Sequence, residues 1–163
     1  MKMSHEEYLQ MALDTARESV QEGGGPFGAV VVKNGKIIAK AANRVVLDAD
    51  PTAHAEILAI REAARKLGSY NLSGCVLYAS AEPCPMCMGA IYWSCIDSTY
   101  YACSVEETTR AGFDDQWMYR EFTLPIGRRI LPFVRIQLES RLEPFEHWEK
   151  LPQKVDYSIK SSK

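Results

Sequence analysis

The chain has 163 residues, of which 47% are hydrophobic and 25% are charged, as in soluble globular domains that build a real core. Its formal net charge is −2, so the chain does not have the excess of basic residues that nucleic-acid-binding proteins usually carry. The opening residues are polar and no apolar run is long enough to cross a bilayer, so the sequence predicts a cytoplasmic protein without a signal peptide.

Helix and strand signals alternate along the chain. Ser4 begins a capping-box pattern, and Asn34-Gly35 favours a two-residue hairpin turn. Asp50 before Pro51 is typical of an N-cap followed by the first residue of a helix. The predicted helices are 4–22, 51–67, 84–94, part of 106–119, and 144–150. The predicted strands are 27–32, 36–42, 75–79, 98–102 and 132–139.

This order of elements predicts an α/β fold in which one mixed sheet lies between layers of helices. The first two strands should form an antiparallel hairpin, because only a tight turn separates them. The later strands are separated by helices, so they should run parallel to one another. The sequence contains no internal repeat and no segment with the composition of an interdomain linker.

Two short pieces of chain carry residues that bind zinc. His54-Ala55-Glu56 and Pro83-Cys84-Pro85-Met86-Cys87 together offer one imidazole and two thiolates. Such a set holds a zinc ion and leaves its fourth position open for water, which is typical of a catalytic site. Two cysteines three residues apart at a helix start share one face, and the helix N-terminus favours their thiolate forms.

The spacing of His54 and Glu56 predicts where the metal lies. Side chains two residues apart diverge on a regular helix, so we expect zinc near the beginning of the helix, with His54 in its first turn. Glu56 then reaches the bound water from the side and acts as general base and later as general acid. The metal should therefore lie between two helix starts.

A structural zinc site or a redox pair is the alternative interpretation of Cys84 and Cys87. A structural zinc normally has a fourth protein ligand, and the other histidines, His5 and His147, lie near the chain ends on mostly polar helices. This favours the catalytic interpretation. The remaining cysteines are expected to be small core residues; they are Cys75, Cys95 and Cys103.

The pieces T-A-H-A-E-I and E-P-C-P-M-C-M-G-A-I, with G-P-F-G-A-V-V-V and Asn43 upstream, resemble the cytidine-deaminase-like superfamily of zinc deaminases. The resemblance covers roughly 4–148. It implies a three-layer α/β/α sandwich with a five-stranded mixed sheet, and one Zn²⁺ per subunit with a bound water or hydroxide. It also implies a single deaminase domain over 1–150 and a C-terminal tail over 151–163.

The segment A-G-F-D-D-Q-W at 111–117, with the I-Y-W run at 91–93 and a tail tyrosine, resembles the bacterial guanine deaminase family. This resemblance implies a hydrolase of C–N bonds in cyclic amidines that converts guanine to xanthine and ammonia in purine catabolism. It further implies a homodimer that exchanges C-terminal segments, so that a tail tyrosine closes the partner's pocket. The implied substrate-binding residues are Asn43, Asp115, Phe27, Ala55 through its backbone, Trp93 and Tyr157.

The chemistry of guanine suits these side chains. Guanine presents N1–H and an amine as donors, and an ionised Asp115 is an acceptor only. Asn43 can donate and accept, and Phe27 and Trp93 can stack on the purine. Simpler roles remain open: Asp114 and Asp115 as helix caps, Asn43 as a turn residue, the two aromatic side chains as core residues, and the tail as a frayed end.

Three other functions stay open from the sequence. A tRNA adenosine deaminase shares the E-P-C-x-M-C piece, although it should carry a basic surface. A deaminase of cytosine, cytidine or guanosine would use the same metal ligands. A non-catalytic zinc-binding interaction module is the alternative outside enzymes, and the glutamate beside the open ligand set disfavours it. We expect a small nucleobase as the partner, with neither membrane nor nucleic acid.

Overall fold

The computed structural model describes residues 3–158. The chain divides into two compact units, Met1–Tyr119 and Arg120–Lys163. The elements of the first unit are α1 (His5–Gln21), β1 (Gly28–Lys33), β2 (Lys36–Ala42), α2 (Ala55–Leu67), β3 (Cys75–Ala81), α3 (Pro85–Trp93), β4 (Ser98–Cys103) and α4 (Val105–Arg110). Helix α5 (Gln116–Thr123) runs across the boundary. The second unit continues with η1 (Ile126–Arg128), η2 (Glu139–Leu142) and α6 (Glu143–Glu149).

The first unit contains a mixed sheet with the strand order β2-β1-β3-β4. Strand β1 pairs antiparallel with both β2 and β3, and β3 pairs parallel with β4. The predicted hairpin is confirmed: Asn34 and Gly35 have φ values of 51° and 77°, the positive angles that its two-residue turn requires. The predicted parallel pairing after the hairpin is confirmed for β3 and β4.

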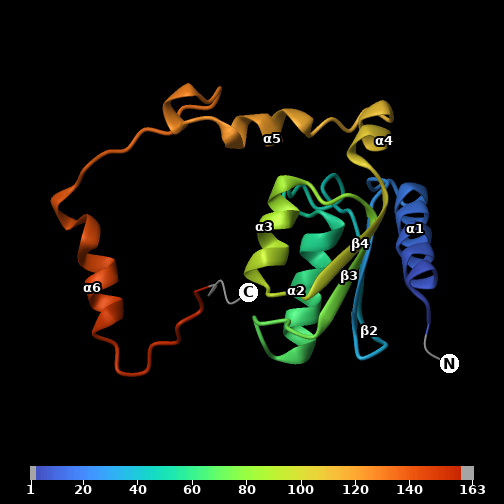
Figure 1. Ribbon diagram of the computed structural model, residues 1–163, viewed down its shortest axis with the longest axis horizontal. Coiled ribbons are helices and arrows are strands. Elements are labelled where there is room, and N and C mark those ends of the chain that lie inside the picture. The colour runs from blue at the N-terminus through green and yellow to red at the C-terminus, as the bar shows by residue number, and fades with distance from the viewer. Residues whose placement is uncertain (1–2, 159–163) are drawn as a thin grey trace. The chain divides into compact units, whose positions relative to one another are not determined.

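Helices cover both faces of this sheet (Figure 1), with α1 on one side and α2 and α3 on the other. The alternation of side chains along a strand explains how one sheet serves two cores. In β1, Val31 joins the cluster beneath α2, which also contains Leu77 of β3. Its neighbour Val30 joins the cluster beneath α1, against Tyr8 and Tyr78. The expected layering of an α/β fold is therefore confirmed.

The prediction of a fifth strand over 132–139 was wrong: among the described residues the sheet has four strands. The apolar side chains of this segment are exposed, with 80% of Val134 and 77% of Ile136 accessible. Their alternating pattern satisfies the side-chain requirement of a strand, but a strand also needs a partner for its backbone N–H and C=O groups. A sequence pattern does not provide that partner.

The predicted start of the second helix was also wrong. Asp50 uses its carboxylate in a local turn, where Oδ1 accepts from the backbone N–H of Thr52 at 2.8 Å and from its hydroxyl at 2.7 Å. Helix α2 begins only at Ala55, and His54 is its N-cap with extended angles of φ −68° and ψ 150°. His54 therefore precedes the first turn and does not lie within it.

The second unit has no core of its own in the residues that are described. Its polar and aromatic groups make local contacts, such as the Arg129 guanidinium 5.9 Å from the ring centre of Phe122 and 5.7 Å from that of Phe133. The terminal helix predicted over 144–150 is confirmed as α6. Across 3–158, no helix is both long and apolar enough to span a membrane.

Candidate active site

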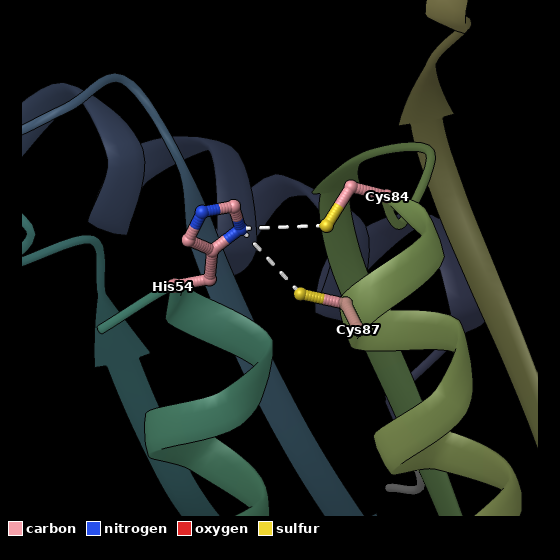
Figure 2. Close-up of side chains that lie close together, drawn as sticks. All are labelled: His54, Cys84 and Cys87. Atoms are coloured by element: carbon pink, nitrogen blue, oxygen red, sulfur yellow. Dashed lines mark hydrogen bonds between the residues drawn. The ribbon is translucent and has the colours of Figure 1, made fainter. Parts of the chain in front are cut away.

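The three predicted zinc ligands come together at the starts of α2 and α3 (Figure 2). His54 Nδ1 lies 3.6 Å from the Sγ atoms of both Cys84 and Cys87, and the ligand atoms all lie within 4.8 Å of one another. Zinc bonds of about 2.0–2.1 Å to nitrogen and 2.3 Å to sulfur at a tetrahedral angle place N and S about 3.6 Å apart. The donor set therefore fits zinc in both chemistry and spacing.

The backbone explains why these side chains converge. His54 is the N-cap of α2 and Cys84 is the N-cap of α3, and neither side chain caps its own helix. Both residues are extended, so their side chains leave the helix axis and turn toward one another (Figure 2). Pro85 fixes the first turn of α3, which holds Cys87 on the same face. Within 3–158, no fourth His, Cys, Asp or Glu joins this group, which leaves a position open.

Electrostatics in the cluster favour a thiolate beside the imidazole. Hydrogen bonds from Cys87 and His54 hold the pKa of the Cys84 thiol well below its usual range, despite burial. The hydrogen bond with Cys84 raises the pKa of His54. A metal ion needs the deprotonated thiols and the neutral imidazole, so binding it releases the protons that these groups share.

Glu56 is the second residue of α2 and is buried, with 7% of its surface accessible. Burial raises the pKa of this carboxyl group, because a charged group is disfavoured away from water. Glu56 lines the same cavity as His54 and Cys84. A carboxyl group with a raised pKa next to a reacting site is suited to take up and return a proton near neutral pH.

The cavity beside the cluster has a volume of about 440 Å³, within the range of small-molecule sites. Six of the predicted site residues line it: Phe27, Asn43, His54, Glu56, Cys84 and Asp115. Cys87 is fully buried and is not among the residues that line the cavity. The side chain of Ala55 belongs to the core, so only its backbone remains for the role predicted for it.

The two adjacent aspartates have different roles. Asp114 Oδ1 accepts from the backbone N–H of Gln116, the first residue of α5, at 3.0 Å. Asp115 lines the cavity, and its Oδ1 is buried without a hydrogen-bond partner among the described residues. Burial, followed by the negative charge of Cys84, raises the pKa of Asp115. An unpaired buried acceptor is costly, so this oxygen marks a place where a ligand donor fits.

The cavity also contains residues that the sequence did not single out as contacts. Phe113 meets Phe27 edge-to-face, with ring centres 5.0 Å apart and an interplanar angle of 87°. Glu82 and Thr108 line the same space. The signals for Phe113 and Glu82 were their places in the A-G-F-D-D-Q-W and E-P-C-P-M-C-M-G-A-I pieces, whereas nothing in the sequence pointed to Thr108.

The structure does not bring Trp93 into this cavity. Trp93 is the last residue of α3, at the opposite end from Cys84, and 59% of its surface is accessible. A helix rises about 1.5 Å per residue, so nearness to Cys87 in sequence does not mean nearness to the metal. Tyr157 lies in the second unit and is exposed; its predicted role stays a prediction.

The predicted core cysteines fall into two classes. Cys75 is fully buried in the core below α2, as expected. Cys95 and Cys103 are only half-buried, and neither belongs to the ligand group.

Comparison with known proteins agrees with this site. The family model of the cytidine and deoxycytidylate deaminase zinc-binding region matches residues 2–103. The chain belongs to this family. It is 47% identical to the guanine deaminase of Bacillus subtilis (strain 168) over 156 residues, covering 95% of this chain and all of that protein. It is 46% identical to the tRNA-specific adenosine deaminase of Aquifex aeolicus (strain VF5) over 100 residues, covering 61% of this chain and 66% of that protein.

Solved structures of guanine deaminases are similar to this chain in both fold and sequence. The crystal structure of Bacillus subtilis guanine deaminase has a TM-score of 0.93 to this deaminase, with 47% identity over 96% of this chain and 100% of that one. A guanine deaminase from Nitrosomonas europaea has a TM-score of 0.67, with 36% identity over 71% of this chain and 66% of that one. The family and the donor set together make zinc the metal of this site.

Proposed function

We propose that this protein is a guanine deaminase, which hydrolyses guanine to xanthine and ammonia. The observation that carries the proposal is the unpaired, buried Oδ1 of Asp115 in the same cavity as Glu56 and the ligands of the metal. The similarity to Bacillus subtilis guanine deaminase, which extends over nearly the whole chain, supports it independently.

Glu56 moves the protons of the reaction. Bound by His54, Cys84 and Cys87, zinc would act as a Lewis acid and lower the pKa of a water molecule in the cavity. Glu56 accepts a proton from the attacking water as its oxygen bonds to C2 of guanine, and it passes this proton to the ring nitrogen N3. It then takes the second proton, from the new hydroxyl group on C2, and gives it to the amine, so that the C2–N bond breaks, a C2=O bond forms and ammonia leaves.

Asp115 selects the base by its hydrogen-bonding character. An ionised carboxylate only accepts hydrogen bonds, and guanine offers it the N1–H donor. Adenine carries a lone pair at N1, which would face the carboxylate acceptor to acceptor. Sites with buried polar groups strongly reject analogues that leave those groups unpaired, so adenine should be a poor substrate.

The charge of the cavity favours a free base over a nucleotide or tRNA. Among the described residues, neither lysine nor arginine lines the cavity. Four acidic residues do: Glu56, Glu82, Asp114 and Asp115. A phosphate would be repelled there, since like charges in a poorly solvated site are unfavourable. This disfavours the alternative of a tRNA adenosine deaminase, a class represented by relatives that match only part of this chain.

The substrate assignment is tested by ammonia release from guanine, guanosine, cytosine, cytidine and adenine, and from a tRNA containing adenosine at the wobble position. We expect guanine to give the highest kcat/KM. The proposal fails if any of the others is turned over faster than guanine at equal concentration.

Replacing Asp115 by Asn should lower kcat/KM for guanine by about 10²-fold, because an amide NH₂ in place of the lost carboxylate oxygen meets the N1–H donor to donor. The matched control is Asp97→Asn, in which the remaining amide oxygen can still accept from the backbone N–H of Gly74. Steady-state kinetics on both variants decide the point. Wild-type kinetics in Asp115→Asn would rule out the recognition of guanine by this carboxylate.

The proposal includes a homodimer that exchanges its C-terminal segment, 151–163, with Tyr157 closing the partner's cavity. The second unit buries none of its described apolar side chains, among them Phe133, Ile136 and Phe145. An isolated chain would therefore expose more apolar surface than monomers usually do. A single deaminase domain over 1–150, a cytoplasmic location and a place in purine catabolism belong to the same proposal.

Light scattering should give the mass of a dimer at micromolar concentration. Tyr157→Ala should raise KM for guanine while the mass stays that of a dimer. A fully active monomer would contradict the exchange.

A further inference from the structure

The main chain of Asn43 is held from two sides. Its N–H donates to the carbonyl oxygen of Phe27 at 2.9 Å, so two cavity residues share one backbone contact. Its own carbonyl oxygen accepts from the hydroxyl of Ser19, on α1, at 3.1 Å. Ser19 and Asn43 are both buried, with 3% and 7% of their surfaces accessible. Helix α1, which contributes no residue to the cavity lining, thus contacts the cavity through Asn43.

The side chain of Asn43 has a defined orientation. The backbone N–H of Val45 donates to Asn43 Oδ1 at 3.1 Å, and since an N–H needs an acceptor, this contact identifies the oxygen of the amide. The NH₂ group of Asn43 donates to none of the residues over 3–158. Asn43 lines the cavity, so its NH₂ group is the part left for a ligand.

Gly25 keeps this orientation by leaving space. A Cβ atom at position 25 would lie 2.8 Å from Asn43 Oδ1 and 2.9 Å from its Cγ, closer than carbon atoms approach without displacement. The requirement is for room rather than for a positive φ, because Gly25 is not among the residues with positive φ. Any side chain here would push the amide away from Val45.

We propose that Ser19 and Gly25 are positioning residues that fix Asn43 so that its amide presents only donors to the substrate. This inference rests on the proposed function. With Asp115 as acceptor and Asn43 as donor, the cavity requires a heterocycle that offers a donor to one side and an acceptor to the other. Guanine satisfies both, because it carries N1–H together with the acceptors O6 and N7.

A double-mutant cycle tests the positioning role. Asn43→Ala should lower kcat/KM for guanine by about 10- to 100-fold, the value of one or two lost hydrogen bonds. Gly25→Ala should lower it by a similar factor, mainly through a higher KM, and should retain the zinc content of the wild type. In the Asn43→Ala background, adding Gly25→Ala should cost less than about 2-fold, because there is no amide left to displace. Ser19→Ala should behave in the same way with a smaller effect.

Gly127→Ala is the control, since a Cβ there meets no atom within 4 Å, and its kinetics should equal those of the wild type. If Gly25→Ala costs the same factor with and without Asn43, or acts by losing zinc and kcat at constant KM, the positioning role is wrong. If Asn43→Ala itself leaves guanine kinetics unchanged, the proposed recognition of the base by the Asn43 side chain is wrong. These outcomes are distinct, so the experiment separates the two failures.

Discussion

Glu56→Gln should leave the protein folded and loaded with zinc while lowering kcat for guanine by about 10²- to 10⁴-fold, the usual contribution of a general acid–base residue. The glutamine side chain has the size of glutamate and fits the buried site at the start of α2, but it does not take up a proton. Single-turnover kinetics and elemental analysis on the same sample measure both parts of this expectation.

Glu62→Gln provides the matched control, because it makes the same change on the same helix. Among the described residues, Glu62 pairs with Arg65 and Lys66, and ion pairs of such solvent-accessible side chains contribute little to stability. Its kinetics should match the wild type. Substantial turnover by Glu56→Gln with normal zinc content would remove Glu56 from the proton-transfer role.

Cys84→Ser should have the second large effect, the loss of both zinc and activity. Serine keeps the shape of the side chain but replaces a thiolate ligand by a hydroxyl group that stays protonated, and zinc prefers nitrogen and sulfur ligands. A ligand present at a hundredfold excess over its Kd stabilises the folded state by about 2.7 kcal/mol, so Tm should fall together with the metal content. Treating the wild type with a chelator should reproduce the same Tm.

Cys103→Ser separates this effect from general sensitivity to the loss of a thiol. Cys103 is a half-buried free cysteine in β4 and is not part of the ligand group. The variant should keep one zinc per subunit. Stoichiometric zinc in Cys84→Ser would show that the site is built differently from the geometry in Figure 2.

The metal ligands were predictable from sequence because their chemistry is local. The spacing of Cys84 and Cys87 determines that both thiols leave one helix start on the same side. One imidazole and two thiolates without a fourth protein ligand are typical of a catalytic zinc site. The exact start of α2 was not predictable, since Asp50 before Pro51 has the same pattern whether it caps a helix or closes a turn with Thr52. Only the tertiary position of His54 distinguishes a helix cap at Asp50 from a turn at Asp50.

The substrate side of the cavity was predictable only in part. Residues 114 and 115 are both aspartate and both line the cavity. The sequence does not show that Asp114 accepts from the backbone N–H of Gln116 whereas Asp115 Oδ1 has no partner among the described residues. Trp93 lies outside the cavity of its own chain, because a sequence shows the distance along α3 but not which end of the helix meets the cavity, and its contact with substrate stays a prediction. Segment 132–139 shows the same limit: its apolar alternation is real, and whether it forms a strand depends on a partner elsewhere.

The two kinds of helix start in this fold imply a trade between stability and activity. Helices α1 and α4 begin with serine capping boxes at Ser4 and Ser104, whereas α2 and α3 begin with His54 and Cys84, whose side chains cap nothing. Serine or aspartate at those two positions would add about 1 kcal/mol of helix stability each and would remove the metal. A screen that selects thermostability alone should therefore accumulate inactive variants at positions 54 and 84, so stabilising substitutions are better sought at other sites.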